Sequence, residues 1–306
     1  MSNNPKNKIL LEAWNLIKDD ISLKKMYFIP GLLSIVFLTI LLIYQSIYTY
    51  VVIFHQKDKA LEIILNFFHS NYAIEIIIIF VIFILIYLLL SPIFEAALIK
   101  YISKKSKNEE ITPWEALSLG FYKFLPLFKY NNLFSEFKFI SVFNWYLFII
   151  RIFDWKYIKE ISYVFLVLLI LASLINIIII YSRYIIVLEN KQVFNSIAKS
   201  TRLSIATFAT TLKLYFLMFI LNTRVIFNFI IFLAFPVTII TLISLITTKI
   251  FLTITIIILS IFFITLILFL GYLTWVLEVF KTAIWFFAYK NAINKLHKID
   301  KELEKE

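Results

Sequence analysis

The stretch IEIIIIFVIFILIYLLLSPIFEAALI, residues 74–99, decides the class of this protein. A bilayer core about 30 Å thick needs about 20 helical residues to cross it, and this stretch is longer than that. Five further apolar runs occur, at 27–54, 139–153, 163–182, 214–236 and 251–278. The pattern predicts an all-α polytopic membrane protein, a bundle of six transmembrane helices that forms one domain over residues 1–306.

Composition supports the same class. Hydrophobic residues make up 62% of the chain and charged residues 16%, against about 45–50% and about 25% in soluble domains. No cysteine occurs, which excludes disulfides, thiolate metal sites and cysteine nucleophiles. The net charge is +11. Because the positive residues are concentrated in particular loops between the apolar runs, we expect membrane lipids rather than nucleic acid as partners.

The lysines and arginines predict the topology. Segments 1–26, 100–138, 183–213 and 281–306 carry 23 of them, whereas 55–71, 151–160 and 237–250 carry six. Positive residues concentrate in cytoplasmic loops. We therefore expect a multi-pass protein of the inner (plasma) membrane with both termini in the cytoplasm.

Two points of this topology stay open. The run at 139–153 is short and lies between Lys138 and Arg151, so it is either tilted or does not cross fully. The sequence NTR at 222–224 is alternatively a hairpin loop, which would expose Arg224, place Lys213 inside a span and put the lysine-rich tail outside. Both consequences are energetically costly, so six spans are preferred.

An amphipathic segment precedes each pair of spans, at 7–21, 113–129 and 192–208. The apolar positions recur at helical spacing. Thr112, Pro113 and Glu115 form a capping-box pattern at the start of the second segment. We expect these helices to lie in the cytoplasmic interface of the membrane. The apolar faces are Ile9, Leu10, Ala13, Trp14, Ile17 and Ile21; Trp114, Leu117, Phe121, Leu125 and Phe128; and Val193, Phe194, Ile197, Thr201, Ile205 and Phe208.

The chain thus divides into three units of one interfacial helix and two spans, at 1–103, 111–188 and 190–290, followed by a tail at 291–306. An offset of 80 residues aligns the second amphipathic segment with the third, pairing Trp114 with Phe194. The alternative is that any cytoplasmic loop near lipid becomes amphipathic. Tryptophans near both membrane faces, Trp145 and Trp155 outside and Trp14, Trp114 and Trp285 inside, are expected to be interfacial anchors.

Two stretches carry a resemblance to a known family. SPIFEAALIKYISKKSKNEEITPWEALSLGFYKFLPLF at 91–128 has a proline-containing span, a basic loop and an amphipathic helix, and RYIIVLENKQVFNSIAKSTRL at 183–203 follows a span with an arginine and an acidic segment. Together with IPGLL at 29–33, they resemble the YciC-like family, which is related to the membrane domain of some glycerophosphodiesterases. The resemblance implies a six-helix prokaryotic membrane protein and does not bring the phosphodiesterase chemistry with it.

Few residues offer chemistry. The histidines are His55, His69 and His297, and the first two flank one outer loop without a carboxylate at ligand spacing, which indicates a solvated loop rather than a metal site. No phosphate-binding, zinc-protease or nucleophile-elbow motif occurs. The sequence predicts no catalysis, no cofactor and no metal.

The candidate site residues are polar side chains within the spans: Arg224, Asn228, Glu278 and Glu95. Arg224 lies near the middle of the run at 214–236, where a charge is costly unless it faces protein or water. We expect it to pair with Glu278, although Lys281 is an alternative partner for that carboxylate. The other interpretation is a binding site for an anion or a lipid phosphate.

These features favour a non-enzymatic protein that organises the membrane or interacts with lipids, with other membrane proteins as further candidate partners. The alternative is a small transporter or channel that uses Arg224 as an intramembrane anion site.

Overall fold

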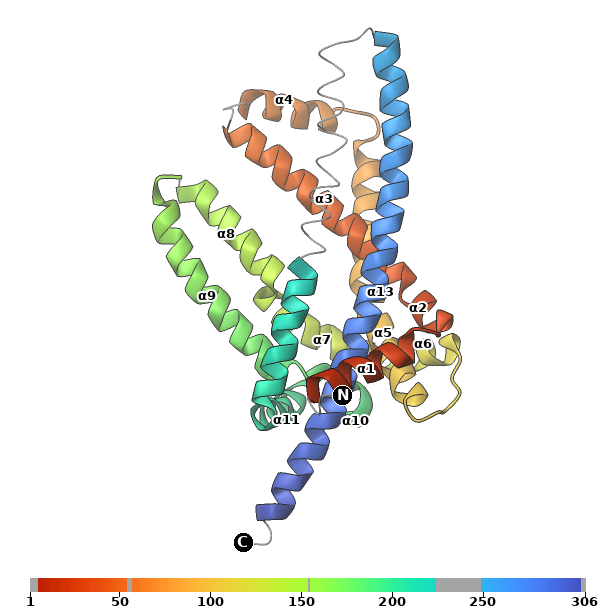
Figure 1. Cartoon of the computed structure of the whole chain (residues 1–306). Helices are drawn as coiled ribbons and strands as arrows, with labels where there is room; N and C mark the ends of the chain where they lie inside the picture. The colour runs from red at the N-terminus through yellow and green to blue at the C-terminus, as the bar shows by residue number, and fades with distance from the viewer. Residues whose placement is uncertain (1–4, 54–56, 154, 224–248, 304–306) are drawn as a thin grey trace.

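The computed structural model describes residues 5–53, 57–153, 155–223 and 249–303 and is all-helical in these ranges (Figure 1). The elements are α1 (Pro5–Ile17), α2 (Ile21–Met26), α3 (Phe28–Ile53), α4 (Lys57–Phe68), α5 (Ala73–Lys105), α6 (Pro113–Tyr122), α7 (Phe124–Phe134), η1 (Ser135–Phe137), α8 (Phe139–Phe153), η2 (Trp155–Tyr157), α9 (Ile158–Ile179), α10 (Ser182–Glu189), α11 (Val193–Ala206) and α13 (Lys249–Leu303). A further helical segment, Phe208–Thr223, follows α11.

Four stretches in this part of the chain are helical, long and apolar enough to cross a membrane, namely Phe28–Gln45, Ala73–Lys105, Ile158–Glu189 and Thr253–Glu302. The number rises to six if two bent pairs each count as one span. One pair joins Phe124–Phe137 to Phe139–Ile150 at 44°, and the other joins Val193–Ala206 to Phe208–Thr223 at 100°. The all-α class predicted from sequence is confirmed, and the described residues hold four to six candidate membrane spans.

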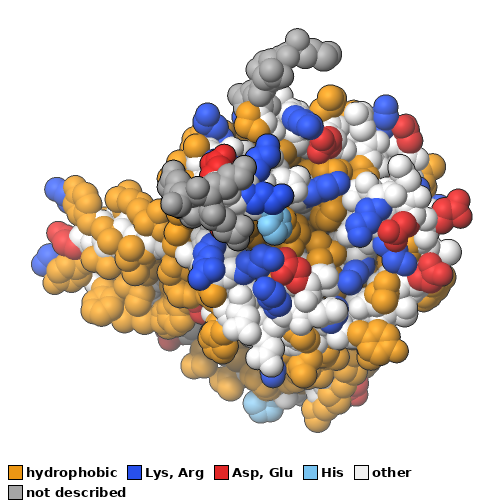
Figure 2. Space-filling view, turned by 90° about the horizontal axis from the view of Figure 1, so that it is seen from below, with side chains coloured by type: hydrophobic (Ala, Val, Ile, Leu, Met, Phe, Trp, Pro, Cys, Tyr) orange, Lys and Arg blue, Asp and Glu red, His pale blue; other side chains and the backbone are white. Residues whose placement is uncertain are grey.

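The two ends of the molecule differ in content. The lower end in Figure 1 holds the end of α13 and the short helices α1, α2, α6, α7, α10 and α11, whereas α4 and the start of α13 lie at the upper end. Figure 2 looks at the lower end from below, and lysine and arginine side chains gather over it. The described parts of segments 1–26, 100–138, 183–213 and 281–306, which the lysine count assigns to the cytoplasm, thus lie at one end of the molecule.

The hydrophobic core sits at this lysine-rich end. It combines buried residues of the short helices with those of α5, α9 and α13, including Ala13, Ile99, Leu127, Ile185 and Val279. The upper parts of the spans leave large apolar side chains exposed over most of their length, such as Ile79 at 66%, Val164 at 59% and Ile257 at 56%. Such exposure suits contact with lipid tails, which solvate apolar surface.

The amphipathic segments form helices where the pattern predicted them, with different bounds. The first ends at Ile17, and Asp20 then caps α2 by accepting a hydrogen bond from the Leu23 N–H at 2.8 Å. The second begins at the predicted capping box, in which Thr112 and Glu115 bond each other's backbone, but it breaks at Lys123 into α6 and α7. The third ends at Ala206.

Small residues set how closely these helices pack. A side chain at Gly120 of α6 would lie 2.9 Å from both the Cβ and the N atom of Ala97 on α5. Gly31 of α3 meets α13 in the same way, because its Cβ would lie 3.2 Å from the Cα of Trp275. These two contacts need glycine because any side chain would push the helices apart.

Two expectations were wrong. The segment that was expected to be a solvated loop contains the helix α4, whose Leu61, Ile64, Leu65 and Phe68 recur at helical spacing and are exposed. Trp285 is not an interfacial anchor, since only 3% of it is exposed and its ring lies 6.3 Å from that of Tyr181. Trp14 and Trp114 are exposed, as anchors require.

Candidate functional site

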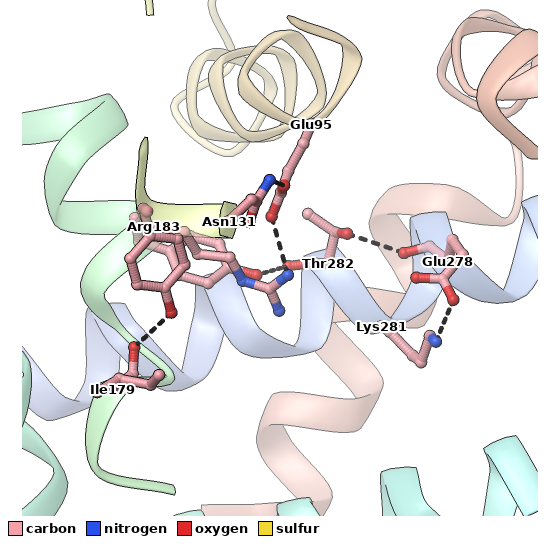
Figure 3. A network of polar contacts seen from close by, with 9 residues as sticks. Glu95, Asn131, Ile179, Arg183, Glu278, Lys281 and Thr282 are labelled. Carbon is pink, nitrogen blue, oxygen red and sulfur yellow. Dashed lines mark hydrogen bonds and ion pairs between the residues drawn. The ribbon is translucent and has the colours of Figure 1, made fainter. Parts of the chain in front are cut away.

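A buried polar network that joins several helices lies around Glu95. This carboxylate sits on α5 three residues beyond Pro92. Its Oε1 atom accepts a hydrogen bond from Nη1 of Arg183 on α10 at 3.0 Å, and its Oε2 atom accepts one from Nδ2 of Asn131 on α7 at 3.1 Å (Figure 3). The two charged side chains are largely buried, with 14% of Glu95 and 25% of Arg183 exposed.

Aromatic side chains complete this network. The Tyr130 hydroxyl donates to the carbonyl of Ile179 at 3.1 Å, and the Tyr184 hydroxyl donates to the carbonyl of Thr282 at 3.0 Å. The Arg183 guanidinium lies 5.3 Å from the centre of the Tyr184 ring, a cation–π geometry. These contacts therefore connect α5, α7, α9, α10 and α13, and Arg183 supplies the positive charge.

Glu278 belongs to a separate pair on α13. Its carboxylate bonds Lys281, three residues further along the helix, and Lys281 Nζ also donates to Oδ1 of Asn222 at 2.9 Å. Figure 3 shows this pair apart from Glu95 and Arg183. Glu278 is 38% exposed and Lys281 13%. Lys281, the alternative partner expected for Glu278 from the sequence, is thus the partner that the structure shows.

The remaining candidates, Arg224 and Asn228, lie outside the described residues. The expected pair of Arg224 with Glu278 therefore stays a prediction. Asn222 and Thr223 are helical, so the hairpin alternative finds no turn at its first two residues. The structure does not bring Glu95 and Glu278 together into one site.

Two further carboxylates tie short helices to spans. Glu189 at the end of α10 accepts bonds from Lys199 of α11 at 2.7 Å and from the Tyr289 hydroxyl of α13 at 2.6 Å. Asp20 lies 3.2 Å from the Tyr101 hydroxyl and 3.5 Å from Lys105, both on α5. These bonds join α2, α10 and α11 to long helices at the lysine-rich end.

Sequence reasoning missed Arg183, Asn131 and the tyrosines of the network. Arg183 was counted with the positive residues of a cytoplasmic loop, where most lysines and arginines are solvated. A signal was present, because Glu95 lies near the end of one apolar run, Arg183 directly follows another, and the two carry opposite charges. Nothing in the spacing along the chain, however, shows that α5 and α10 pack together.

The arrangement offers ion pairs and hydrogen bonds but little reactive chemistry. Within the described ranges, no three His, Asp or Glu side chains are placed to hold a metal ion. A hollow of about 420 Å³ lies between α1, the end of α5 and α13, and its lining includes Lys8, Glu12 and Lys290. That hollow does not include Glu95 or Glu278.

No family model, curated protein or solved structure matches this chain. The function of the chain must therefore be inferred from the geometry of its described residues. That geometry consists of a polar network that holds the core together, a lysine-rich end and short helices with exposed apolar faces.

Proposed function

We propose that this chain is an integral protein of the inner (plasma) membrane that organises lipids at the cytoplasmic face without catalysing a reaction. One observation carries the proposal: two of the short helices, α6 and α11, turn mainly small residues to the protein and large apolar residues outward. On α6, Ala116 is fully buried and Phe121 is 68% exposed. On α11, Ser196 is fully buried and Phe194 is 76% exposed.

This orientation is the reverse of what a soluble helix shows, since such a helix packs its large apolar face against the core. Large apolar side chains are stable outside the core when lipid solvates them, and helices with such a face lie in the plane of the interface. The exposed apolar faces of α6 and α11 therefore support the proposed interfacial position. The lysines of the same end support a cytoplasmic location.

We further propose that the three units are a structural repeat. α6 packs on the preceding span α5, α11 packs on the end of the preceding span α9, and α1 packs on α13, where Trp14 and Phe280 meet edge to face at 6.1 Å. The offset of 80 residues pairs Ala116 with Ser196 and Gly120 with Ser200. Ser200 bonds the carbonyl of Ile178 at 2.7 Å, so both small positions face the preceding helix.

The YciC-like resemblance is part of this proposal. The acidic and basic residues within the quoted stretches, Glu95, Arg183, Glu189 and Lys199, form ion pairs that join different helices. These ion pairs give a physical reason why the quoted stretches carry acidic and basic residues at these positions. The transporter alternative depends on Arg224 and Asn228, and the described residues supply no observation that favours it.

The proposal is tested by the depth of single cysteines in vesicles. The chain has no cysteine, so Phe121→Cys, Phe194→Cys and, as the control, Glu302→Cys each give one labelling site. A fluorophore at positions 121 and 194 should be quenched by lipids that carry a nitroxide on the upper acyl chain, because the apolar faces are expected about 5–10 Å deep. Position 302 should respond only to a soluble quencher. If the soluble quencher alone quenched the fluorophore at positions 121, 194 and 302, the interfacial position of α6 and α11 would be refuted.

A further inference from the structure

Four lysines gather where α5 meets the junction of α6 and α7. Lys100 and Lys104 lie one helical turn apart on α5, Lys107 follows its end, and Lys123 separates α6 from α7. Gly120 of α6 lies against Ala97 of α5, three residues before Lys123 and Lys100 respectively, and the positive charges of Lys123, Lys104 and Lys107 act on Lys100. In the part of the chain that the structure describes, none of the four is in an ion pair.

Three of these lysines are also partly withdrawn from solvent, since Lys100, Lys104 and Lys123 are half-buried. Lysine is seldom buried without a partner, because water solvates its ammonium group well. Neighbouring charges of the same sign add repulsion. An anion held between these side chains would remove both costs, so the cluster has the character of an anion site.

The position of the cluster indicates which anion. At 1.5 Å per residue, α5 covers about 40 Å from Ala73 to Lys100, which matches the 40–45 Å or so of a bilayer with its headgroups. A spanning α5 therefore places Lys100 at the level of the lipid phosphates. The residues just before Lys123 are aromatic and exposed, Phe121 at 68% and Tyr122 at 79%, as is common at the membrane interface.

We propose that Lys100, Lys104 and Lys123 bind the phosphate of an anionic phospholipid of the cytoplasmic leaflet. The inference rests on the proposed function and deepens it, because it names a lipid class and a site. The ammonium groups supply the charge and the hydrogen-bond donors that a phosphate requires. The neighbouring aromatic side chains lie where the glycerol and the upper acyl chains of that lipid begin.

The test uses the full-length protein in a neutral detergent, titrated with short-chain phosphatidylglycerol while the midpoint of thermal unfolding is followed. A ligand that binds only the folded state raises this midpoint as its concentration passes Kd. Removing a lysine near an anionic lipid weakens binding about fivefold. Lys100→Gln with Lys123→Gln should thus shift the titration to roughly 25-fold higher lipid concentration.

The matched control is Lys298→Gln with Lys301→Gln, which removes the same charge from the exposed tail of α13 and should leave the titration unchanged. Lys100→Arg with Lys123→Arg keeps the charge and should keep the binding. If the double variant Lys100→Gln with Lys123→Gln does not fold, the single variant Lys123→Gln is titrated instead, and its titration should shift to about fivefold higher lipid concentration.

Equal weakening in the cluster and the tail variants would overturn the site, because binding would then follow net charge alone. Equal protection by phosphatidylcholine or by inorganic phosphate would overturn the choice of an anionic lipid. The cysteine-depth experiment is independent of these outcomes, so the site can fail while the interfacial position of α6 stands.

Discussion

Glu95 of α5 and Arg183 of α10 are 88 residues apart in the sequence and joined by a 3.0 Å bond in the core. The carboxylate uses its second oxygen to hold Asn131, and the guanidinium lies against the Tyr184 ring. A buried pair depends on hydrogen bonds to its remaining groups as well, and of these groups the buried Nε atom of Arg183 has no hydrogen-bond partner among the described residues. The pair therefore fixes how α5 packs against α10.

A double-mutant cycle measures this pair. Glu95→Leu or Arg183→Leu leaves one charge buried without its partner, so each change should lower stability by about 2–3 kcal/mol, somewhat below the cost for fully buried pairs. The double change should recover much of that loss. The midpoint and the enthalpy of thermal unfolding in detergent give the four values of the cycle.

Lys18 and Asp19 provide the control cycle, because this pair is 46% and 84% exposed and 3.8 Å apart. Exposed pairs contribute about 0–1 kcal/mol, so its cycle should give almost no coupling. Additive effects at Glu95 and Arg183 as well would contradict the role assigned to them.

Glu278 gives a second cycle that compares two partners. Its bond to Lys281 predicts a coupling of about 0.5–1 kcal/mol, as for partly exposed pairs. The cycle of Glu278→Leu with Arg224→Leu tests the pair predicted from the sequence. If Glu278 is coupled to Lys281 and not to Arg224, the pair predicted from the sequence is wrong. If Glu278 is not coupled to Lys281, the pair in the structure does not contribute to stability.

The contact between α6 and α5 is tested at Gly120. Gly120→Ala places a methyl group 2.9 Å from Ala97, and such overpacking costs about 1–3 kcal/mol. Gly271→Ala is the matched control, because the nearest atom to its new Cβ is 3.8 Å away on Leu32. Alanine favours a helix over glycine by about 1 kcal/mol, so this control should be neutral or stabilising. A stabilising Gly120→Ala would show that α6 does not pack so closely.

Much of the fold could be predicted from the sequence. Apolar runs fix the long helices because a span needs length and hydrophobicity, both of which are local properties. The capping box at Thr112 was predictable for the same reason, since its two partners are three residues apart. The lysine distribution also agreed with the two ends of the described structure.

What the sequence could not show depends on contacts between distant residues. The helical period revealed the apolar faces of α6 and α11, but it did not reveal that small residues such as Ala116 and Ser200 would make the contact with protein. In a membrane protein the large apolar face can turn to lipid, so hydrophobicity alone does not indicate the packed face. Likewise, Arg183 becomes a core residue only through the packing of α10 on α5.

The lysine-rich end gives the most direct test of the whole account, because α1 and the end of α13 lie at that end and α4 lies at the other (Figure 1). A reporter that is active only in the cytoplasm is fused after Glu306 in one strain and inserted at Lys57 in another. We predict activity at Glu306 and none at Lys57, as expected when cytoplasmic segments hold 23 positive residues and the opposite ones six. Activity at Lys57 together with its absence at Glu306 would contradict the account, because the short helices and their lysines would then face outward.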